Sequence, residues 1–128
     1  KPETFDFLGF TFYCGKGKKS GNFCVKLKTN RKKFQQKLKA VKEWLYEHQT
    51  MPVKELIMKL NPKLVGHYRY YGVSHNIAKI GAFLHFVQRY LFKVLNRRSH
   101  RQSYTWDGYI DMLKVYPLAK PKIYVKLF

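Results

Sequence analysis

The sequence predicts an α+β fold, mainly α, in which an N-terminal β-hairpin packs beside a bundle of three main helices and a short fourth. Two patterns lead to this prediction. Residues 4–28 alternate their side chains around a Gly-rich turn, as the strands of a hairpin do. Residues 29–116 repeat apolar side chains every three to four positions, as amphipathic helices do. A chain of 128 residues is long enough for one domain with its own core.

The hairpin is expected to combine a strand over residues 4–13, a basic loop over 14–22 and a strand over 23–28. Gly9 in the first strand indicates a bulge or a close backbone approach. Cys14 and Cys24 match no zinc-ligand spacing. They can face each other across the hairpin as one disulfide, although free thiols in a reducing cytosol are favoured.

A first helix is expected from an N-cap at Thr29 or Asn30 to about His48. Its apolar stripe repeats at i, i+4, i+7 and i+11: Phe34, Leu38, Val41 and Leu45. Residues 16–42, from the hairpin loop into this helix, contain eleven basic residues and no acidic one. Such a run is often only a solvated face. Because this one spans a loop, a strand face and a helix start, we interpret it as a nucleic-acid contact.

The second helix is expected to begin near Pro52 and to close at Gly72. Pro62 lacks an amide hydrogen, so the Asn61-Pro62 pair should kink this helix or split it in two. In its second half one stripe comprises Leu60, Leu64, His67 and Tyr71, with Tyr68 at the edge, and we interpret Tyr68 and Tyr71 as core residues. On the other sides, Arg69 and Tyr70 offer a cation and a stacking ring to a partner.

The third and longest helix is expected over residues 74–96, with Lys79, Arg89 and Lys93 on its polar side. Its apolar stripe comprises Ile77, Ile80, Leu84, Val87, Leu91 and Leu95. A short fourth helix, capped by Thr105 and ending at Tyr116, is expected to bury Trp106, Ile110 and Leu113. The extended tail can add a strand to the hairpin. The predicted division is a hairpin (1–28), a helical domain (29–116) and a tail (117–128).

The charge balance indicates a polyanionic partner. The chain has 26 Lys and Arg against 7 Asp and Glu, a formal charge of +19. Nucleic acid is the first candidate and an anionic membrane surface the second. No apolar run approaches the roughly 20 residues that span a bilayer. The apolar stripes of the helices are also expected to pack into a core, which disfavours a membrane-surface role.

Catalysis by this chain alone is not expected. Metal-assisted phosphoryl transfer needs clustered carboxylates, whereas the seven acids are scattered over four elements. No Gly-rich phosphate loop precedes a helix. The five histidines are unclustered, and His67 and His85 lie on or near apolar faces, where a hydrogen-bonded core histidine is more common than a ligand or base.

Four features in this order resemble a known family: the Phe7-Leu8-Gly9-Phe10 strand, the basic segment entering a helix, the block from Leu60 to Gly72, and the aromatic-rich helix ending in Asn96-Arg97-Arg98. Over nearly its whole length the chain resembles the C-terminal part of a bacterial group II intron-encoded reverse transcriptase. That part is the end of the palm followed by the thumb, which is also called the maturase or X domain. Many such proteins carry Trp at the position of His67.

The resemblance implies a division of labour. The palm, upstream of this segment, carries the Tyr-Ala-Asp-Asp motif and the Mg²⁺ ions, and this chain lacks that motif. We therefore expect no polymerisation by the chain itself and no cofactor of its own. The implied partners are group II intron RNA, which the domain helps to splice, the RNA template–DNA primer duplex, and the remainder of the reverse transcriptase in a bacterial cytoplasm. No membrane or small-molecule partner is expected.

The predicted nucleic-acid-binding residues are cations of the hairpin, helices and connector together with one tyrosine. They are Lys16, Lys18, Lys19, Lys26, Lys28, Arg31, Lys32, Lys33, Lys37, Lys63, Arg69, Tyr70, Lys79, Arg89, Lys93, Arg97, Arg98 and Arg101. Two alternatives remain open. One is a general structural RNA-binding protein without intron specificity, and the other is an autonomous nuclease or polymerase.

Overall fold

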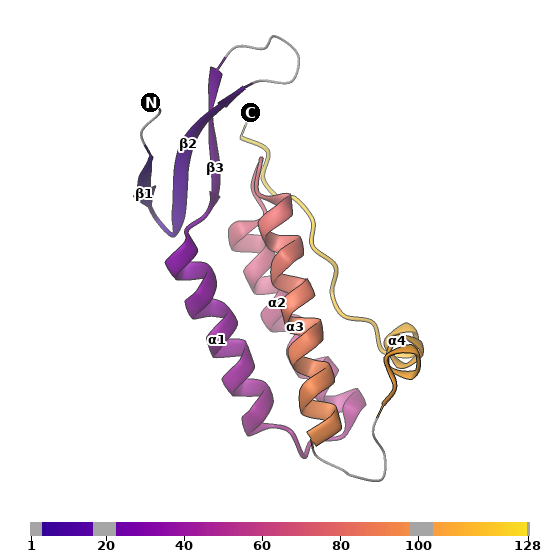
Figure 1. Cartoon of the computed structure of the whole chain (residues 1–128). Coiled ribbons are helices and arrows are strands. Elements are labelled where there is room, and N and C mark those ends of the chain that lie inside the picture. Colours follow the sequence, from indigo (N-terminus) through magenta and orange to yellow (C-terminus); the bar gives the residue numbers. More distant parts are fainter. Residues whose placement is uncertain (1–3, 17–22, 98–103, 128) are drawn as a thin grey trace.

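A computed structural model describes residues 4–16, 23–97 and 104–127. Figure 1 shows a small sheet at one end of a helical bundle, with a short helix at the side and the C-terminal tail running back toward the sheet. The elements are β1 (Phe5–Phe7), β2 (Phe10–Lys16), β3 (Phe23–Thr29), α1 (Arg31–Glu47), α2 (Val53–Tyr71), α3 (Ile77–Arg97) and α4 (Trp106–Val115). The predicted α+β, mainly α class is confirmed.

The predicted first strand is in fact two strands. β1 and β2 pair antiparallel, with Phe7 opposite Phe10, and the sheet order is β1-β2-β3. Leu8 and Gly9 form the turn with φ of 53° and 85°. Two consecutive positive φ angles give the tight hairpin turn that matches the twist of the strands. The prediction of one strand over residues 4–13 was wrong because alternation continues through a two-residue turn.

The turn at Gly9 also makes the close approach that the sequence suggested. A Cβ added there would lie 2.8 Å from the hydroxyl of Tyr71. The amide of Asn30 donates a hydrogen bond to the Gly9 carbonyl at 2.8 Å. The Asn30 side chain in turn caps α1 by accepting from the amide of Lys33 at 3.1 Å. These contacts fix the β1–β2 turn against the N-terminus of α1 and the C-terminus of α2.

A buried amide joins β3 to the connection between α2 and α3. Asn76 is fully buried, and its side-chain nitrogen donates to the Thr29 hydroxyl at 2.7 Å and the Tyr71 carbonyl at 2.8 Å. Its side-chain oxygen accepts from the Thr29 amide at 2.8 Å. Both polar atoms of the Asn76 side chain are thus hydrogen-bonded away from water, and these three bonds orient the sheet relative to the bundle.

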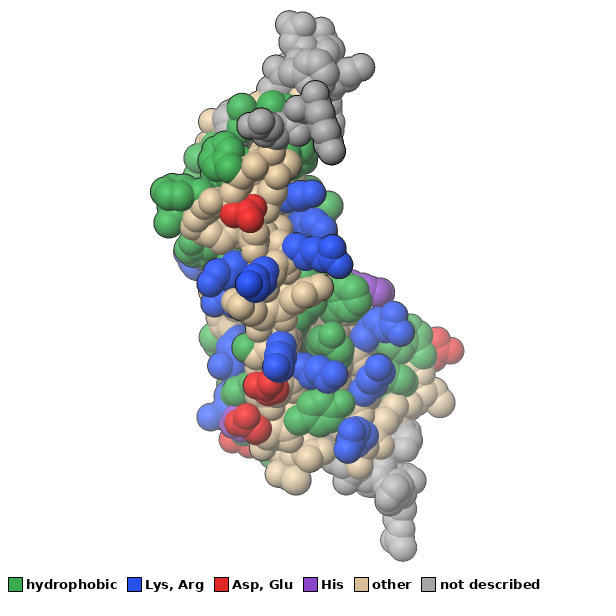
Figure 2. Space-filling model, turned by 60° about the vertical axis from the view of Figure 1, so that its left-hand side comes forward, with side chains coloured by type: hydrophobic (Ala, Val, Ile, Leu, Met, Phe, Trp, Pro, Cys, Tyr) green, Lys and Arg blue, Asp and Glu red, His purple; other side chains and the backbone are tan. Residues whose placement is uncertain are grey.

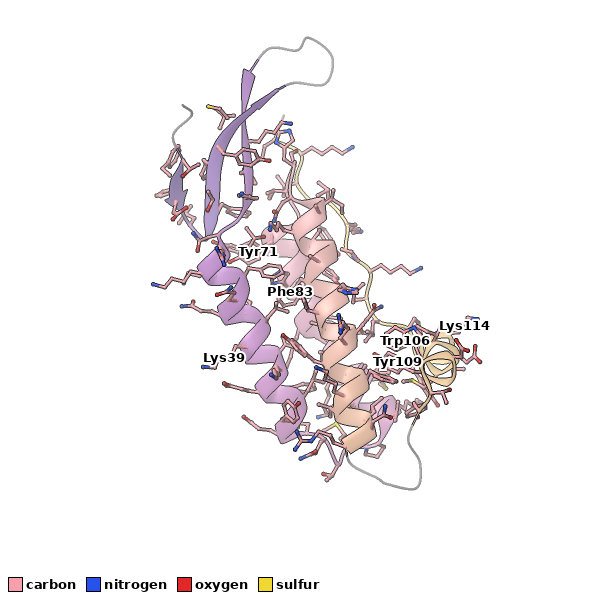
Figure 3. All side chains as sticks on the ribbon, in the orientation of Figure 1. Lys39, Tyr71, Phe83, Trp106, Tyr109 and Lys114 are labelled. Atoms are coloured by element: carbon pink, nitrogen blue, oxygen red, sulfur yellow. The ribbon has the colours of Figure 1, made fainter. Side chains whose placement is uncertain are left out.

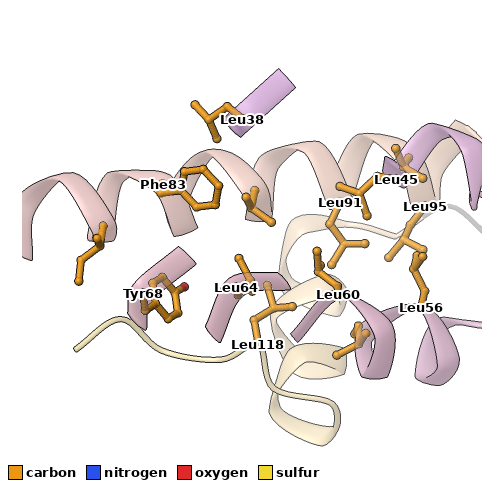
Figure 4. Packing of buried hydrophobic residues seen from close by; sticks show 14 of the residues in the cluster. Leu38, Leu45, Leu56, Leu60, Leu64, Tyr68, Phe83, Leu91, Leu95 and Leu118 are labelled. Carbon is orange, nitrogen blue, oxygen red and sulfur yellow. The ribbon is translucent and has the colours of Figure 1, made fainter. Parts of the chain in front are cut away.

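The core lies between the three long helices, as Figure 4 shows. The predicted stripe of α2 is confirmed, because Leu60, Leu64, His67, Tyr68 and Tyr71 are all buried. Helix α2 runs without interruption through Pro62, so the predicted split does not occur. Helix α3 contributes the other half of the core: Ile80, Phe83, Val87, Leu91, Val94 and Leu95.

The outer elements depart from the predicted apolar stripes. Ile77, the first residue of α3, is half exposed. In α4 the buried residue is Tyr109, whose hydroxyl donates to the Gln88 carbonyl at 2.7 Å, whereas Trp106 is half exposed. Because its hydroxyl is hydrogen-bonded, the ring of Tyr109 can be buried completely. Thr105 caps α4 as predicted.

The tail packs along α2 and does not join the sheet within its described residues. Asn61 holds it at one end, donating to the Pro117 carbonyl at 3.0 Å and accepting from the Ala119 amide at 2.8 Å. At the other end Val125 forms an isolated parallel bridge with Val73. The third strand of the sheet comes from residues 5–7 instead.

Candidate nucleic-acid interface

Helix α1 presents its basic side chains in three directions. Arg31, Lys32, Lys33 and Lys37 are all exposed. By the helical period, Lys33 and Lys37 lie on the flank toward α2, Arg31 lies on the flank toward α3, and Lys32 points outward. Figure 3 shows Lys39, on the same outer side, pointing away from the bundle. The predicted cations of α1 therefore border two separate grooves.

The first groove, the α1–α2 cleft, has a volume of about 920 Å³. Three exposed lysines line it, Lys33 and Lys37 from α1 and Lys63 from α2, and the β1–β2 turn lines one end. Its other side chains are small, aliphatic or aromatic: Ala40, Val41, Trp44, Gly66, His67, Tyr70, Tyr71 and Phe83. A cationic border over an aromatic interior suits a nucleic acid, because phosphates and bases need these two kinds of contact.

The interior of the α1–α2 cleft contains a stack of rings. The ring centroids of His67 and Phe83 are 3.6 Å apart, and those of His67 and Tyr71 are 4.8 Å apart. Figure 3 shows Tyr71 and Phe83 between α1 and the other two long helices. His67 is 8 % exposed, and its Nε2 has no hydrogen-bond partner among the described residues. The expectation of a core position for His67 is confirmed, but the structure gives its Nε2 no hydrogen bond within the described part of the chain.

Burial also determines the charge of His67. Desolvation, and secondly the positive charge of Lys37, lower the pKa of His67 from 6.5 to about 4. The imidazole is therefore neutral at pH 7. The ring lines the cleft without adding a positive charge, and its Nε2 is buried without a hydrogen-bond partner among the described residues.

The second groove, the α1–α3 seam, lies on the opposite flank of α1 and has a volume of about 720 Å³. Three exposed cations and three aromatic rings line it: Lys28, Arg31, Lys79, Phe34, Phe86 and Tyr90. Figure 2 shows a face on which Lys and Arg side chains alternate with hydrophobic ones and acidic ones are sparse.

Cations and rings from α1 and α3 meet across the α1–α3 seam. The Nζ of Lys79 lies 5.9 Å from the ring centroid of Phe34. In the same seam, the Nζ of Lys42 lies 5.3 Å from the ring centroid of Tyr90. Farther along, the guanidinium of Arg97 lies 5.2 Å from the ring of Tyr46. Such contacts attract a cation by about 0.5–1 kcal/mol at exposed sites and leave its charge intact.

Few of these charges are neutralised within the domain. In residues 4–16, 23–97 and 104–127 the one ion pair is Lys114–Asp111, at 3.4 Å on α4. The predicted cations of both grooves thus lack a carboxylate partner in the part of the chain that the structure describes. Their charges are available to phosphate groups.

The predicted pair Arg69 and Tyr70 is divided between two surfaces. Arg69 lies 5.0 Å from the ring centroid of Tyr124 in the tail. Tyr70 lines the α1–α2 cleft and is 52 % exposed, but its hydroxyl donates to the Leu8 carbonyl at 2.6 Å. Tyr70 is therefore a wall of the cleft that the β1–β2 turn holds in place.

The other predicted cations have varied positions. Arg89 and Lys93 are exposed on α3, and Lys26 is half-buried on β3 beside Gly15. Lys16 ends β2, but its side chain lies outside the described part of the structure. The remaining four also lie outside the described residues: Lys18, Lys19, Arg98 and Arg101.

Sequence reasoning missed two residues of these grooves. Trp44 lines the α1–α2 cleft, and the Nζ of Lys63 lies 5.1 Å from its ring centroid. Lys42 belongs to the α1–α3 seam. The helical period contained the first signal, because Trp44 follows Lys33 and Lys37 at i+11 and i+7 on one flank of α1.

The described residues contain no group of three or more His, Cys, Asp or Glu that could hold a metal ion. Cys14 is a free thiol opposite Val25, while Cys24 is opposite Gly15, so the strand register does not pair the cysteines. No helix among the described residues is long and apolar enough to cross a bilayer.

The fold and its two grooves define a strongly basic helical domain with a small antiparallel sheet. A family model described as group II intron, maturase-specific domain matches residues 31–109, from the start of α1 into α4. This is more than half of the chain, and the chain belongs to that family. Membership implies a part in group II intron splicing, with group II intron RNA as partner, and a non-catalytic domain of reverse transcriptase proteins. Comparison with curated proteins and with solved structures gave no match.

Proposed function

We propose that this domain binds group II intron RNA directly, through the basic flanks of α1, and so helps the intron reach its spliced fold. The observation that carries the proposal is the set of exposed cations along α1 and its neighbours without carboxylate partners in the described residues. A-form RNA is held mainly through phosphates and 2′-hydroxyls, which such cations can contact.

The same surface suits a second role in the reverse transcriptase. An RNA template–DNA primer duplex carries two phosphate backbones, and the grooves on either side of α1 place cations in two directions. We propose that the domain acts as the thumb that grips this duplex, with the sheet at the junction to the palm. If about 6–10 phosphates are neutralised, affinity falls by orders of magnitude over a few-fold rise in salt.

The proposal is tested by replacing Arg31, Lys32 and Lys33 together with Ala. The first turn of α1 contains no acidic residue, and cations there oppose the helix dipole. The triple variant should therefore fold at least as stably as the wild type. We expect its affinity for a group II intron RNA to fall more than tenfold at near-physiological salt, with a shallower dependence of log Kd on log salt.

A charge-matched control replaces Lys114, Lys120 and Lys126 with Ala, which removes the same three charges from α4 and the tail. This control should retain most of the affinity. Equal losses in the two variants would contradict a specific role for α1. Competition between intron RNA, an unrelated structured RNA and an RNA–DNA duplex then separates intron recognition from general RNA binding. A preference of about tenfold, or 1.4 kcal/mol, for the intron RNA is expected.

A further inference from the structure

The α1–α2 cleft is open because small residues stand where both helices face it. On α2, Lys63, Gly66, His67 and Tyr70 follow at i, i+3, i+4 and i+7 and all line the cleft. A Cβ added at Gly66 would meet nothing within 4 Å. On α1, Ala40 lies between Lys37 and Trp44 on the lining flank. The helices thus leave room beside the lysines and the rings, although Nζ of Lys63 lies 5.1 Å from the ring centroid of Trp44.

The interior of this cleft holds a polar atom that the domain itself does not satisfy. His67 is 8 % exposed, and its Nε2 is buried without a hydrogen-bond partner among the described residues. A buried polar atom without a hydrogen bond costs about 1–3 kcal/mol. His67 lines the cleft, but this atom is closed to solvent, so a ligand that carries a complementary group reaches it only after a small movement of the lining side chains.

We propose that the α1–α2 cleft receives one unpaired nucleotide of the bound RNA. The base enters between α1 and α2, contacts the ring of Trp44 and hydrogen-bonds to Nε2 of His67. The flanking phosphates contact Lys33, Lys37 and Lys63. The inference rests on the proposed binding of RNA and adds that the domain distinguishes an unpaired base from a paired one.

Size and chemistry both favour this ligand. A volume of about 920 Å³ lies within the roughly 300–1,000 Å³ of small-ligand sites. A base in a duplex has its faces and its pairing edge occupied, whereas an unpaired base can stack on rings and present that edge. Neutral His67 can accept or donate one hydrogen bond, which a base edge can match. An anion alone would use the lysines and leave the rings and Nε2 without a contact.

The test uses an RNA hairpin with a single bulged purine and the same hairpin with an abasic residue at the bulge. Backbone and charge are identical in the two RNAs, so their difference in affinity measures the base alone. Stacking on aromatic side chains predicts at least about a tenfold preference of the wild-type chain for the bulged purine. Both RNAs should show a similar salt dependence.

Gly66→Leu is the variant that fills the cleft, and Gly81→Leu in α3 is its matched control. An added Cβ meets nothing within 4 Å at either glycine, and both changes improve helix propensity, so both variants should fold. Gly66→Leu should bind the two hairpins equally, while Gly81→Leu should retain the tenfold preference. A preference that survives in Gly66→Leu would overturn the assignment to this cleft.

A spectroscopic measurement locates the base independently. The chain contains two tryptophans, and Trp106 lies on α4 outside the cleft. In a Trp106→Phe variant, the fluorescence of Trp44 should be quenched by the bulged purine and not by the abasic hairpin. If the wild type binds both hairpins equally and Trp44 does not respond, the nucleotide site is refuted while RNA binding stands. If neither hairpin binds, the proposed function fails as well.

Discussion

The two flanks of α1 carry similar cations but differ in what lies beside them. In the α1–α3 seam the cations lie over aromatic rings, with Lys42 above Tyr90 and Lys79 above Phe34. In the α1–α2 cleft, Lys63 likewise lies over the ring of Trp44, but Ala40 and Gly66 leave open space beside them. Both grooves therefore combine cations with rings. The cleft differs in its larger volume, about 920 Å³ against about 720 Å³, and in the buried stack of His67, Phe83 and Tyr71 in its interior.

Under the proposed binding of RNA, this difference gives one basic helix two modes of contact. Exposed cations contact phosphates regardless of sequence or pairing. A groove with an aromatic interior adds stacking, which depends on whether a base is free to enter. Composition reports only the sum of the two, because the same lysines contribute to the net charge of +19 in either place.

The largest expected effect is on stability, and it distinguishes a buried ring of the cleft from an exposed ring of the seam. Phe83 in the cleft is 1 % exposed and stacks on His67, whereas Phe86 in the seam is 38 % exposed. Phe83→Ala should lower the free energy of unfolding by about 3–5 kcal/mol, because it leaves a cavity in the core. Phe86→Ala should cost about 1 kcal/mol or less. Urea denaturation followed by circular dichroism measures both, and equal losses would contradict the distinction.

The next effect is a pH dependence that only the cleft should show. The pKa of His67 is lowered to about 4 in the fold, against about 6.5 in the unfolded chain. Between these values the unfolded state binds a proton that the folded state does not, so stability falls as the pH falls from about 6.5 to 4. The full shift corresponds to about 3 kcal/mol.

His67→Phe isolates this contribution. The variant keeps a ring against Phe83 and removes both the titrating group and the unpaired nitrogen, so its stability should vary less between pH 7 and pH 4 than that of the wild type. His85 in α3 is exposed, and His85→Phe should retain the wild-type dependence. Denaturation curves at several pH values measure the slopes. Parallel slopes for wild type and His67→Phe would show that His67 does not titrate as its burial implies.

The sequence predicted the helices well because their signals are local. The Asn30 cap, the stripe of α2 and the end at Gly72 each depend on residues within a few turns. Of the kink or split expected at Pro62, the split does not occur. Core packing by Leu60 and Leu64 on either side outweighs the single hydrogen bond that Pro62 cannot make.

The grooves could not be predicted in the same way, because they depend on pairs of residues far apart in the chain. Lys63 and Trp44 meet only when α2 lies beside α1, and Lys42 meets Tyr90 only when α3 lies beside α1. Asn76 likewise finds Thr29 over 47 positions. The list of cations was available from composition and period, whereas their division into a cleft and a seam required the tertiary structure.

The smallest expected effect compares single cations of the two grooves. Lys79→Gln in the α1–α3 seam should weaken binding of the bulged and the abasic hairpin equally and reduce the salt slope by about 0.7–0.9 if one phosphate contact is lost. Lys63→Gln in the α1–α2 cleft should weaken the bulged hairpin more, because Lys63 lies over Trp44, where the base is proposed to stack. Binding titrations of both hairpins at several salt concentrations measure these differences. If Lys79→Gln also changes the ratio of the two affinities, the seam contacts the base as well. The assignment of phosphate contacts to the seam and base contacts to the cleft would then be wrong.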